Sequence, residues 1–213
     1  MYQCVLFDLD GTLVNTYLGI YNSYKYAFEK MKLPFPRATF VGEAIGAPLL
    51  SVFRDRVPLS EEQAIKAVDY YREYYARKGK LEAEVYPGMK ETLKKIKGKG
   101  LNIGVATLKR ENFAKDMLAE LGISRYFDVI YGIDDRDQLT KAELLKKCMN
   151  YLNVKEQETV LVGDSSYDFE GAKEVEMDFI AVTYGFGYSK ESRPKVRETD
   201  YVAENTQDIL SFL

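Results

Sequence analysis

The 213-residue sequence contains no histidine, only two cysteines and no long apolar run. The missing histidine excludes Ser-His-Asp triads, Cys-His pairs and histidine-liganded zinc sites, so acid–base chemistry must fall mainly to carboxylates, lysines or tyrosines. No apolar run approaches the roughly 20 residues of a membrane-spanning helix. Met1–Gln3 leads directly into the first expected strand, so no signal peptide is expected. Cys4 and Cys148 lack a metal-binding spacing. Cys4 lies in an apolar run, which predicts a buried thiol and a cytoplasmic protein.

The composition is typical of a soluble globular protein. Hydrophobic residues make up 46% and charged residues 30% of the chain, and the formal net charge is -3. This balance gives no reason to expect nucleic acid or an anionic membrane surface as a partner. The length fits one large domain, or a core with a modest insertion.

Short apolar runs alternate with amphipathic segments along most of the chain. Runs that are apolar on both faces and separated by helices are typical of a parallel sheet covered on both sides. The predicted fold class is therefore α/β, with a doubly wound, Rossmann-like parallel sheet. The expected strands are Gln3–Asp8, Leu101–Thr107, Phe127–Tyr131, Thr159–Asp164, Asp178–Thr183 and a weak edge strand at Asp200–Ala203. The expected helices are Gly88–Lys99, Glu111–Leu121, Thr140–Asn153, Tyr167–Val175 and Thr206–Leu213.

Helical patterns replace this alternation from Thr16 to about Glu84. An amphipathic segment at residues 17–31 is followed by an expected loop at residues 32–50, which holds three of the six prolines. A further helix is expected to begin after Ser60, a good N-cap residue, and to end near Gly79. The sequence thus predicts an α-helical cap inserted after the first strand. Residues 16–82 would form this cap, and residues 1–15 and 83–213 the α/β catalytic core.

Tyrosines cluster twice inside the predicted cap, at positions 17, 21, 24 and 26 and at positions 70, 71, 74 and 75. The favoured interpretation is that these rings form the core between the cap helices. The alternative is that some of them face a ligand enclosed between the cap and the sheet.

Polar residues follow the ends of several predicted strands. In a parallel sheet of this kind, ligands bind beyond the carboxyl ends of the strands. Side chains from these ends are therefore expected to converge at one edge of the sheet. They are Asp8, Asp10, Thr107, Lys141, Asp164 and Asp168.

The expected cluster has complementary chemistry. Several carboxylates in one cleft require a cation, and oxygen ligands without histidine or cysteine suit Mg²⁺. Asp8 and Asp164 are expected to supply side-chain oxygens, and Asp10 its backbone carbonyl. Thr107 and Lys141 would donate to phosphate oxygens. A metal ion, a phosphate cradle and a carboxylate that can attack together predict phosphoryl transfer through an aspartyl-phosphate.

Asp8 and Asp10 stand two residues apart, so they share one face of the strand and can both reach one phosphate. Asp8, next to the metal ion, is expected to be the nucleophile. Asp10 is expected to hold a proton for the leaving oxygen and then to take one from water. Gly11 permits a sharp turn, and Thr12 is expected to hydrogen-bond across it.

Four stretches of the sequence resemble, in order, the four motifs of the haloacid dehalogenase superfamily. These stretches are "DLDGTLVNT", Thr107 in "VATLK", Lys141 in "TKAELL" and "VGDSSYDFEGA". The insertion directly after the first motif resembles the helical-cap subgroup. Other stretches, including "FVGEAIGAPLLSVF" and "VTYGFGYSKE", look most like the phosphoglycolate phosphatase and 5'-nucleotidase-like group. The resemblance spans essentially the whole chain.

The resemblance implies hydrolysis of a small-molecule phosphomonoester by a monomer or homodimer, and it implies a role for each site residue. Asp8 would be phosphorylated, Asp10 would be the general acid and base, and Thr107 and Lys141 would bind phosphate. The ligands of Mg²⁺ would be Asp8, Asp10 and Asp164, and Asp168 would support the lysine or the metal ion. Phosphatases of this superfamily carry an aspartate at the position of Asp10, which argues against carbon–halogen cleavage.

Contacts to the substrate are also expected from Gly11, Leu108 and, in the cap loop, Gly46. Leu108 stands where a small polar residue commonly follows the threonine in relatives. Glu43 is expected near the substrate entrance, where a carboxylate would disfavour a second anionic group on the substrate.

Alternative interpretations remain open at this point. A pyrophosphatase or a phosphomutase would use the same motifs, and a phospho-aspartate signalling module or a non-catalytic binder would belong to a different class. Thr107 could cap the following helix, Lys141 could be a solvated lysine, and Asp168 could serve its own helix N-terminus. Lys109 and Arg110 are expected to be surface charges.

Overall fold

The computed structural model describes residues 1–37, 39–134, 138–189, 192 and 201–213. Within these residues, six strands form one parallel sheet in the order β5-β4-β1-β6-β7-β8. The predicted strands are confirmed, although Asp200 lies outside the described residues. The strands are β1 (Cys4–Phe7), β4 (Asn102–Arg110), β5 (Val129–Ile133), β6 (Thr159–Gly163), β7 (Asp178–Val182) and β8 (Tyr201–Ala203).

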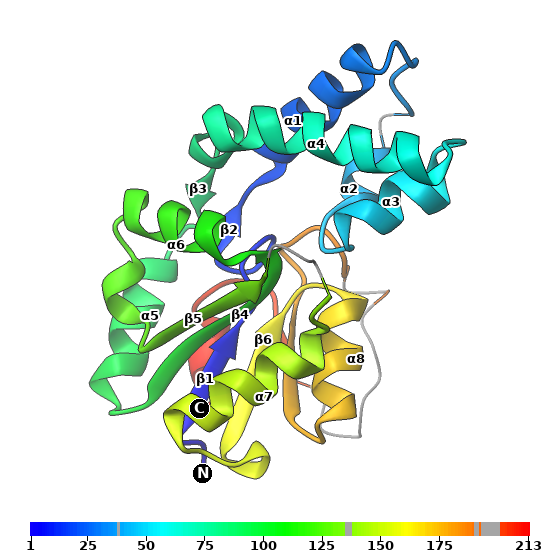
Figure 1. Ribbon diagram of the computed structural model, residues 1–213. Helices are drawn as coiled ribbons and strands as arrows, with labels where there is room; N and C mark the ends of the chain where they lie inside the picture. The colour runs from blue at the N-terminus through cyan, green and yellow to red at the C-terminus, as the bar shows by residue number, and fades with distance from the viewer. Residues whose placement is uncertain (38, 135–137, 190–191, 193–200) are drawn as a thin grey trace.

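Helices cover both faces of the sheet (Figure 1). Val5 and Phe7 belong to the core cluster that contains α5 and α6, whereas Cys4 and Leu6 belong to the cluster that contains α7 and α8. Successive residues of β1 are thus buried on opposite faces, which explains why the strand is apolar without interruption. The helices of the core are α5 (Met89–Gly98), α6 (Glu111–Glu120), α7 (Lys141–Leu152) and α8 (Ser166–Glu174), with short 3₁₀ turns η2 (Ser124–Tyr126) and η3 (Glu156–Glu158).

The α-helix predicted at the C-terminus is wrong, because this segment forms only the 3₁₀ turn η4 (Asp208–Phe212). The Asn205 side chain accepts hydrogen bonds from two backbone N–H groups, including that of Asp208, and the Asp208 carboxylate accepts two more. Such side-chain bonds compete with helical hydrogen bonding, and a segment this short nucleates a helix poorly.

A layer of helices lies above the carboxyl ends of the strands (Figure 1). Ser60 caps its longest helix, with a reciprocal capping box to Gln63, as the sequence predicted. The predicted loop at residues 32–50 is wrong in part, because it contains a short helix and the start of another. Phe40 and Val41 are buried there against the other cap helices, which stabilises the turn. The elements are α1 (Tyr17–Lys30), α2 (Phe40–Ala44), α3 (Leu49–Arg56), α4 (Glu61–Arg77) and the 3₁₀ turn η1 (Gly79–Leu81).

Two short strands connect this layer to the core. β2 (Val14–Asn15) pairs antiparallel with β3 (Glu84–Val85), at the two points where the chain leaves and re-enters the core. The sequence did not predict this ribbon, because two residues are too few to show an alternating pattern. In the described part of the chain, no helix combines the length and apolar character needed to span a membrane.

Candidate active site

The site lies where the strand order reverses. From β1 the chain builds outward through β4 and β5 on one side, and later through β6, β7 and β8 on the other. Asp8 directly follows β1, Asp164 directly follows β6, and Thr107 lies near the end of β4. Since β1 pairs with both β4 and β6, the three side chains meet at one edge, the usual ligand position in such sheets.

Lys141 binds two of the carboxylates. Its Nζ lies 2.6 Å from Asp8 Oδ1 and 2.6 Å from Asp168 Oδ1, and it donates to the carbonyl oxygen of Ala106 at 2.6 Å. The side chain is only 4% exposed, so the alternative of a solvated lysine is wrong. Burial lowers the pKa of Lys141, but the carboxylates of Asp168 and Asp8 raise it by more, so the ammonium stays charged.

Asp168 has both of the roles considered from the sequence. One carboxylate oxygen pairs with Lys141, while Oδ2 accepts hydrogen bonds from the backbone N–H of Ser165 at 3.0 Å and from its hydroxyl at 2.6 Å. The hydrogen bonds between Ser165 and Asp168 Oδ2 belong to a capping box at the start of α8. The helix terminus therefore fixes the orientation of the carboxylate that binds the lysine.

Asp164 is held by a loop that the sequence analysis did not assign. Its Oδ2 accepts hydrogen bonds from the backbone N–H groups of Phe186, at 2.7 Å, and Gly187, at 3.2 Å. Gly11 packs against the same carboxylate with a φ of +86°, and a Cβ at this position would collide with it. Gly11 is thus required both by its turn and by this close approach. The glycines in "VTYGFGY" were the available clue to the loop.

Asp8, Asp164 and Asp168 form a buried cluster in which one oxygen of each lies within 4.8 Å of the others. Burial is the main reason that the pKa of Asp8 rises to about 7, against the opposing effect of Lys141. Burial also raises the pKa of Asp164, and the neighbouring Asp168 and Asp8 add to it. A divalent cation fits this set, because the ligands are all oxygens and three carboxylates exceed the single charge of Lys141. The third carboxylate of the cluster is that of Asp168, whereas Asp10 is expected to contribute its backbone carbonyl.

Asp10 pairs with a lysine that the sequence analysis placed wrongly. Its Oδ2 lies 3.0 Å from Nζ of Lys109, whose side chain is only 8% exposed, so the prediction of a surface charge is incorrect. Oδ1 of Asp10 is buried without a hydrogen-bond partner in the described part of the protein. Burial lowers the pKa of Lys109, but Asp10 and Tyr75 raise it by more, so this ammonium also stays charged.

The two threonine hydroxyls, Thr107 and Thr12, have different contacts. The hydroxyl of Thr107 is almost fully buried and accepts a hydrogen bond from the backbone N–H of Lys109 at 3.2 Å, and it does not cap α6. A backbone hydrogen bond spans the turn at Asp10: the N–H of Thr12 donates to the carbonyl of Leu9 at 3.3 Å. The Thr12 hydroxyl itself is buried and finds no partner among the residues described.

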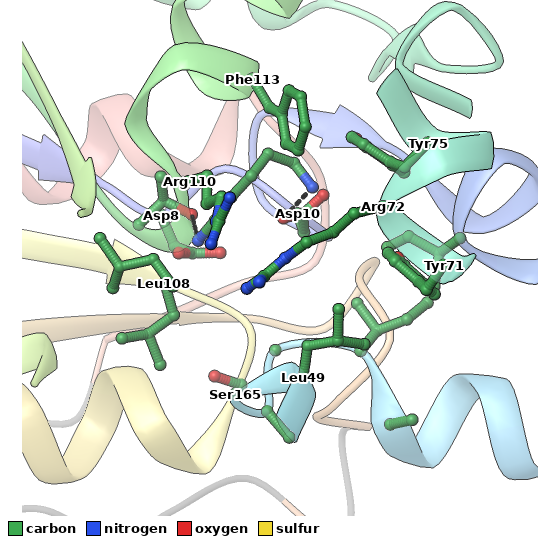
Figure 2. Close-up of a pocket in the computed structure, with 18 of the residues that line it drawn as sticks. Asp8, Asp10, Leu49, Tyr71, Arg72, Tyr75, Leu108, Arg110, Phe113 and Ser165 are labelled. Atoms are coloured by element: carbon green, nitrogen blue, oxygen red, sulfur yellow. Dashed lines mark hydrogen bonds and ion pairs between the residues drawn. The ribbon is translucent and has the colours of Figure 1, made fainter. Parts of the chain in front are cut away.

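A cavity of about 100 Å³ lies between the cap and this edge of the sheet (Figure 2). Its volume is smaller than the roughly 300–1,000 Å³ of pockets that enclose drug-sized ligands, which favours a small ligand. Gly46 and Leu108, which are predicted to contact the substrate, both line it. The core side is lined by Asp8, Asp10, Thr107, Leu108, Lys109, Arg110, Phe113, Ile133, Ser165 and Asp168, and the cap side by Ile20, Tyr24, Ala44, Ile45, Gly46, Ala47, Leu49, Tyr71, Arg72 and Tyr75.

The tyrosine clusters support both interpretations of the sequence. Tyr24, Tyr71 and Tyr75 are buried, and the rings of Tyr24 and Tyr71 meet edge-to-face at 4.9 Å within the cap. The same three side chains line the cavity.

Glu43 does not line this cavity, and its carboxylate binds Arg37 at 2.8 Å. It lines a neighbouring cleft together with Ile45 and Ser165, which also line the cavity. The expected repulsion of a second anionic group at the entrance stays a prediction.

Comparison with known proteins agrees with this geometry. Residues 5–182 match the family model described as haloacid dehalogenase-like hydrolase. The chain belongs to this family. It is 32% identical over 204 residues to a 5'-nucleotidase of Pseudomonas aeruginosa, covering 95% of this chain and 92% of that protein. It is 33% identical over 210 residues to pyrophosphatase PpaX of Halalkalibacterium halodurans, covering 98% and 95%.

A solved structure of the family has the same fold. The predicted phosphatase from Clostridium acetobutylicum superimposes with a TM-score of 0.92 at 35% identity, covering 100% of this chain and 98% of that one. The chain is therefore a hydrolase of the haloacid dehalogenase-like family with an inserted helical cap, as its motifs predicted.

Proposed function

We propose that this hydrolase is a Mg²⁺-dependent phosphatase that cleaves a small phosphomonoester through an aspartyl-phosphate on Asp8. The observation that carries the proposal is the arrangement around Asp8. A buried ammonium lies 2.6 Å from its carboxylate, and Asp10, which also lines the cavity, has one oxygen without a partner among the described residues. A nucleophile and a proton carrier thus line one small space, and a cationic group that can attract phosphate contacts the nucleophile.

Asp8 and Asp10 have different roles in the proposed reaction. Asp8 attacks phosphorus while the P–O bond to the leaving group breaks, and Asp10 gives its proton to the departing oxygen. Asp10 then takes a proton from the water that attacks the aspartyl-phosphate, which releases phosphate and restores Asp8. Thr107 and Lys141 bind the phosphate oxygens, and Asp168 holds Lys141 in place.

Mg²⁺ would be held by the carboxylates of Asp8 and Asp164 and the backbone carbonyl of Asp10, with Asp168 adjacent. When bound, it would balance the negative charge of the carboxylates and of the phosphate. The support for this site is the buried oxygen cluster, in which burial strongly disfavours the ionised carboxylates unless a cation is present.

Residues 16–82 act as a cap that encloses the substrate, and residues 1–15 and 83–213 as the catalytic core. Gly46 and Tyr71 of the cap line the cavity opposite Asp8, so they would exclude water while the phosphoryl group is transferred. The two buried, unpaired thiols fit a reducing cytoplasm, and the protein would act there as a monomer or homodimer.

The substrate class is a small ester with a second anionic group. Arg72 points from α4 into the cavity, and Arg110 lines it from the end of β4 (Figure 2). A guanidinium has five N–H donors, so each can bind a carboxylate or phosphate of the substrate in addition to its contacts within the protein. Pyrophosphate is the second candidate, because it has a second phosphate for the same groups and a relative is named a pyrophosphatase.

A screen of phosphate release tests the proposal. The panel contains phosphoglycolate, nucleoside monophosphates, sugar phosphates, pyrophosphate and p-nitrophenyl phosphate, each with Mg²⁺ and with EDTA. We expect turnover that EDTA abolishes and Mg²⁺ restores. Product isomers without free phosphate would indicate a phosphomutase, and activity that ignores chelation would contradict the metal role of Asp164.

A further inference from the structure

Lys109 connects the cap to Asp10. Its Nζ lies 3.0 Å from Asp10 Oδ2 and 4.6 Å from the centre of the Tyr75 ring. Asp10 and Lys109 belong to the core, whereas Tyr75 belongs to α4 of the cap. Figure 2 shows the ion pair as a dashed line, with Tyr75 on the cap side of it. One ammonium thus contacts the proposed proton carrier and the lid above it.

The ring that covers Lys109 packs against two other rings. Tyr75 is only 2% exposed and stacks on Tyr71 at 5.9 Å with an interplanar angle of 8°. It also contacts Phe113 of the core, with ring centres 5.3 Å apart. A cation over the face of a buried aromatic ring is attracted to it more strongly than in water, because no solvent competes. Tyr75 therefore covers one side of the Lys109 ammonium, whose side chain is only 8% exposed.

The Lys109–Asp10 ion pair also makes the two oxygens of the Asp10 carboxylate different. Oδ2 is occupied by Lys109, while Oδ1 is buried without a hydrogen-bond partner in the described structure. The carboxylate is thus held through one oxygen, and no hydrogen bond from the described residues competes for the other.

We propose that Lys109 is a positioning residue for Asp10 and that Tyr75 completes this arrangement only when the cap lies over the core. This inference rests on the proposed role of Asp10 as proton donor. As the proton moves from Asp10 to the leaving oxygen, Lys109 stays protonated and stabilises the carboxylate that forms. Movement of α4 away from the core would hydrate Lys109 and loosen Asp10, so the proton donor is assembled under the closed cap.

Two substrates with different leaving groups test the inference. p-Nitrophenolate leaves without a proton, whereas the alkoxide of β-glycerophosphate needs one. The parameter is kcat/KM, because it covers only the steps up to departure of the leaving group. For Lys109→Met we expect a loss of at least about 100-fold with β-glycerophosphate and less than about 10-fold with p-nitrophenyl phosphate. Lys109→Arg, which keeps the charge, should recover at least about tenfold of the loss.

Control variants separate this role from general damage. Lys147→Met removes a lysine that also lies 4.6 Å from a tyrosine ring, that of Tyr131, but outside the cavity, and it should match the wild type. Tyr75→Leu should show the same dependence on the leaving group as Lys109→Met, while Tyr75→Phe, which keeps the ring, should not. If Lys109→Met fails to fold, the comparison of Tyr75→Leu with Tyr75→Phe still tests the proposal.

Equal losses with both substrates, or no loss with either, would overturn the role of Lys109. The proposed phosphatase function has its own marker, since Asp8→Asn should lose turnover of both substrates. If Asp8→Asn kept its turnover, the proposed function itself would be overturned, and with it the premise of the inference.

Discussion

Lys141 Nζ lies 2.6 Å from Asp8 Oδ1, although the two residues are 133 positions apart in the sequence. The end of strand β1, which Asp8 follows, and the helix that begins at Lys141 meet because the sheet order brings β1, β4 and the following helices together at one edge. The same ammonium reaches Asp168 at 2.6 Å. The site therefore depends on one buried cation that two carboxylates share.

Replacement of Lys141 by Met should destabilise the metal-free protein strongly. The change leaves Asp8 and Asp168 buried without their cation, at a cost on the order of 3–5 kcal/mol in the free energy of unfolding. Urea denaturation measures it. Lys146→Met is the matched control, because Lys146 is exposed and lies 3.9 Å from Glu174 at the surface, so it should change stability little. Equal stabilities of the two variants would show that the Asp8–Lys141 pair is not buried in solution.

The stability of the metal-free protein should depend on pH through Asp8. Burial raises its pKa to about 7, above the unfolded value near 4, so the folded state binds more protons between these values. The resulting stability is present at about pH 4 and is lost as the pH rises through about 7. We expect Asp8→Asn, which cannot ionise, to gain stability relative to the wild type over this range. Thermal unfolding in EDTA at several pH values measures the difference, and a constant difference would contradict the raised pKa.

The proposed metal site, in which Asp8 and Asp164 hold Mg²⁺ with Asp168 adjacent, predicts that Mg²⁺ stabilises the folded protein. At a concentration 100 times its Kd, a ligand of the folded state adds about 2.7 kcal/mol to the free energy of unfolding. The melting temperature of the wild type should rise with Mg²⁺, and that of Asp164→Asn should rise much less. Asp178→Asn, a change in an acid far from the cluster, should keep the full response. A full response in Asp164→Asn would rule out its role as a ligand.

Arg72→Gln should impair esters that carry a second anionic group. Loss of a charge-assisted hydrogen bond costs about 1.5–3 kcal/mol, so KM for phosphoglycolate should rise by about tenfold or more. KM for p-nitrophenyl phosphate, which lacks that group, should change by less than about threefold. Arg77→Gln alters an exposed arginine of the same helix and should affect neither substrate. A parallel rise for both esters would mean that Arg72 does not select the second anion.

Sequence analysis could locate most of the site because a parallel sheet brings the ends of its strands to one edge. Asp8, Thr107 and Asp164 each follow an apolar run, so their convergence follows from topology alone. Lys109 could not be placed in this way. Its burial depends on Tyr75, a cap residue 34 positions earlier in the chain, and a lysine after a strand has no pattern that reveals such a contact.

The same limit applies to Glu43 and to the C-terminal segment. The Glu43 carboxylate is held by Arg37, and a contact between a loop residue and the short helix that follows it leaves no periodic pattern in the sequence. At the C-terminus, the local hydrogen bonds of Asn205 and Asp208 outweighed a weak helical pattern.

The central claim is that Asp8 becomes phosphorylated during turnover. The most direct measurement is mass spectrometry of the acid-quenched enzyme, taken while it turns over its best substrate with Mg²⁺ present. The account predicts a phosphoryl group on Asp8 in the wild type, and neither this group nor phosphate release in Asp8→Asn. Phosphate release by Asp8→Asn at the rate of the wild type would contradict it.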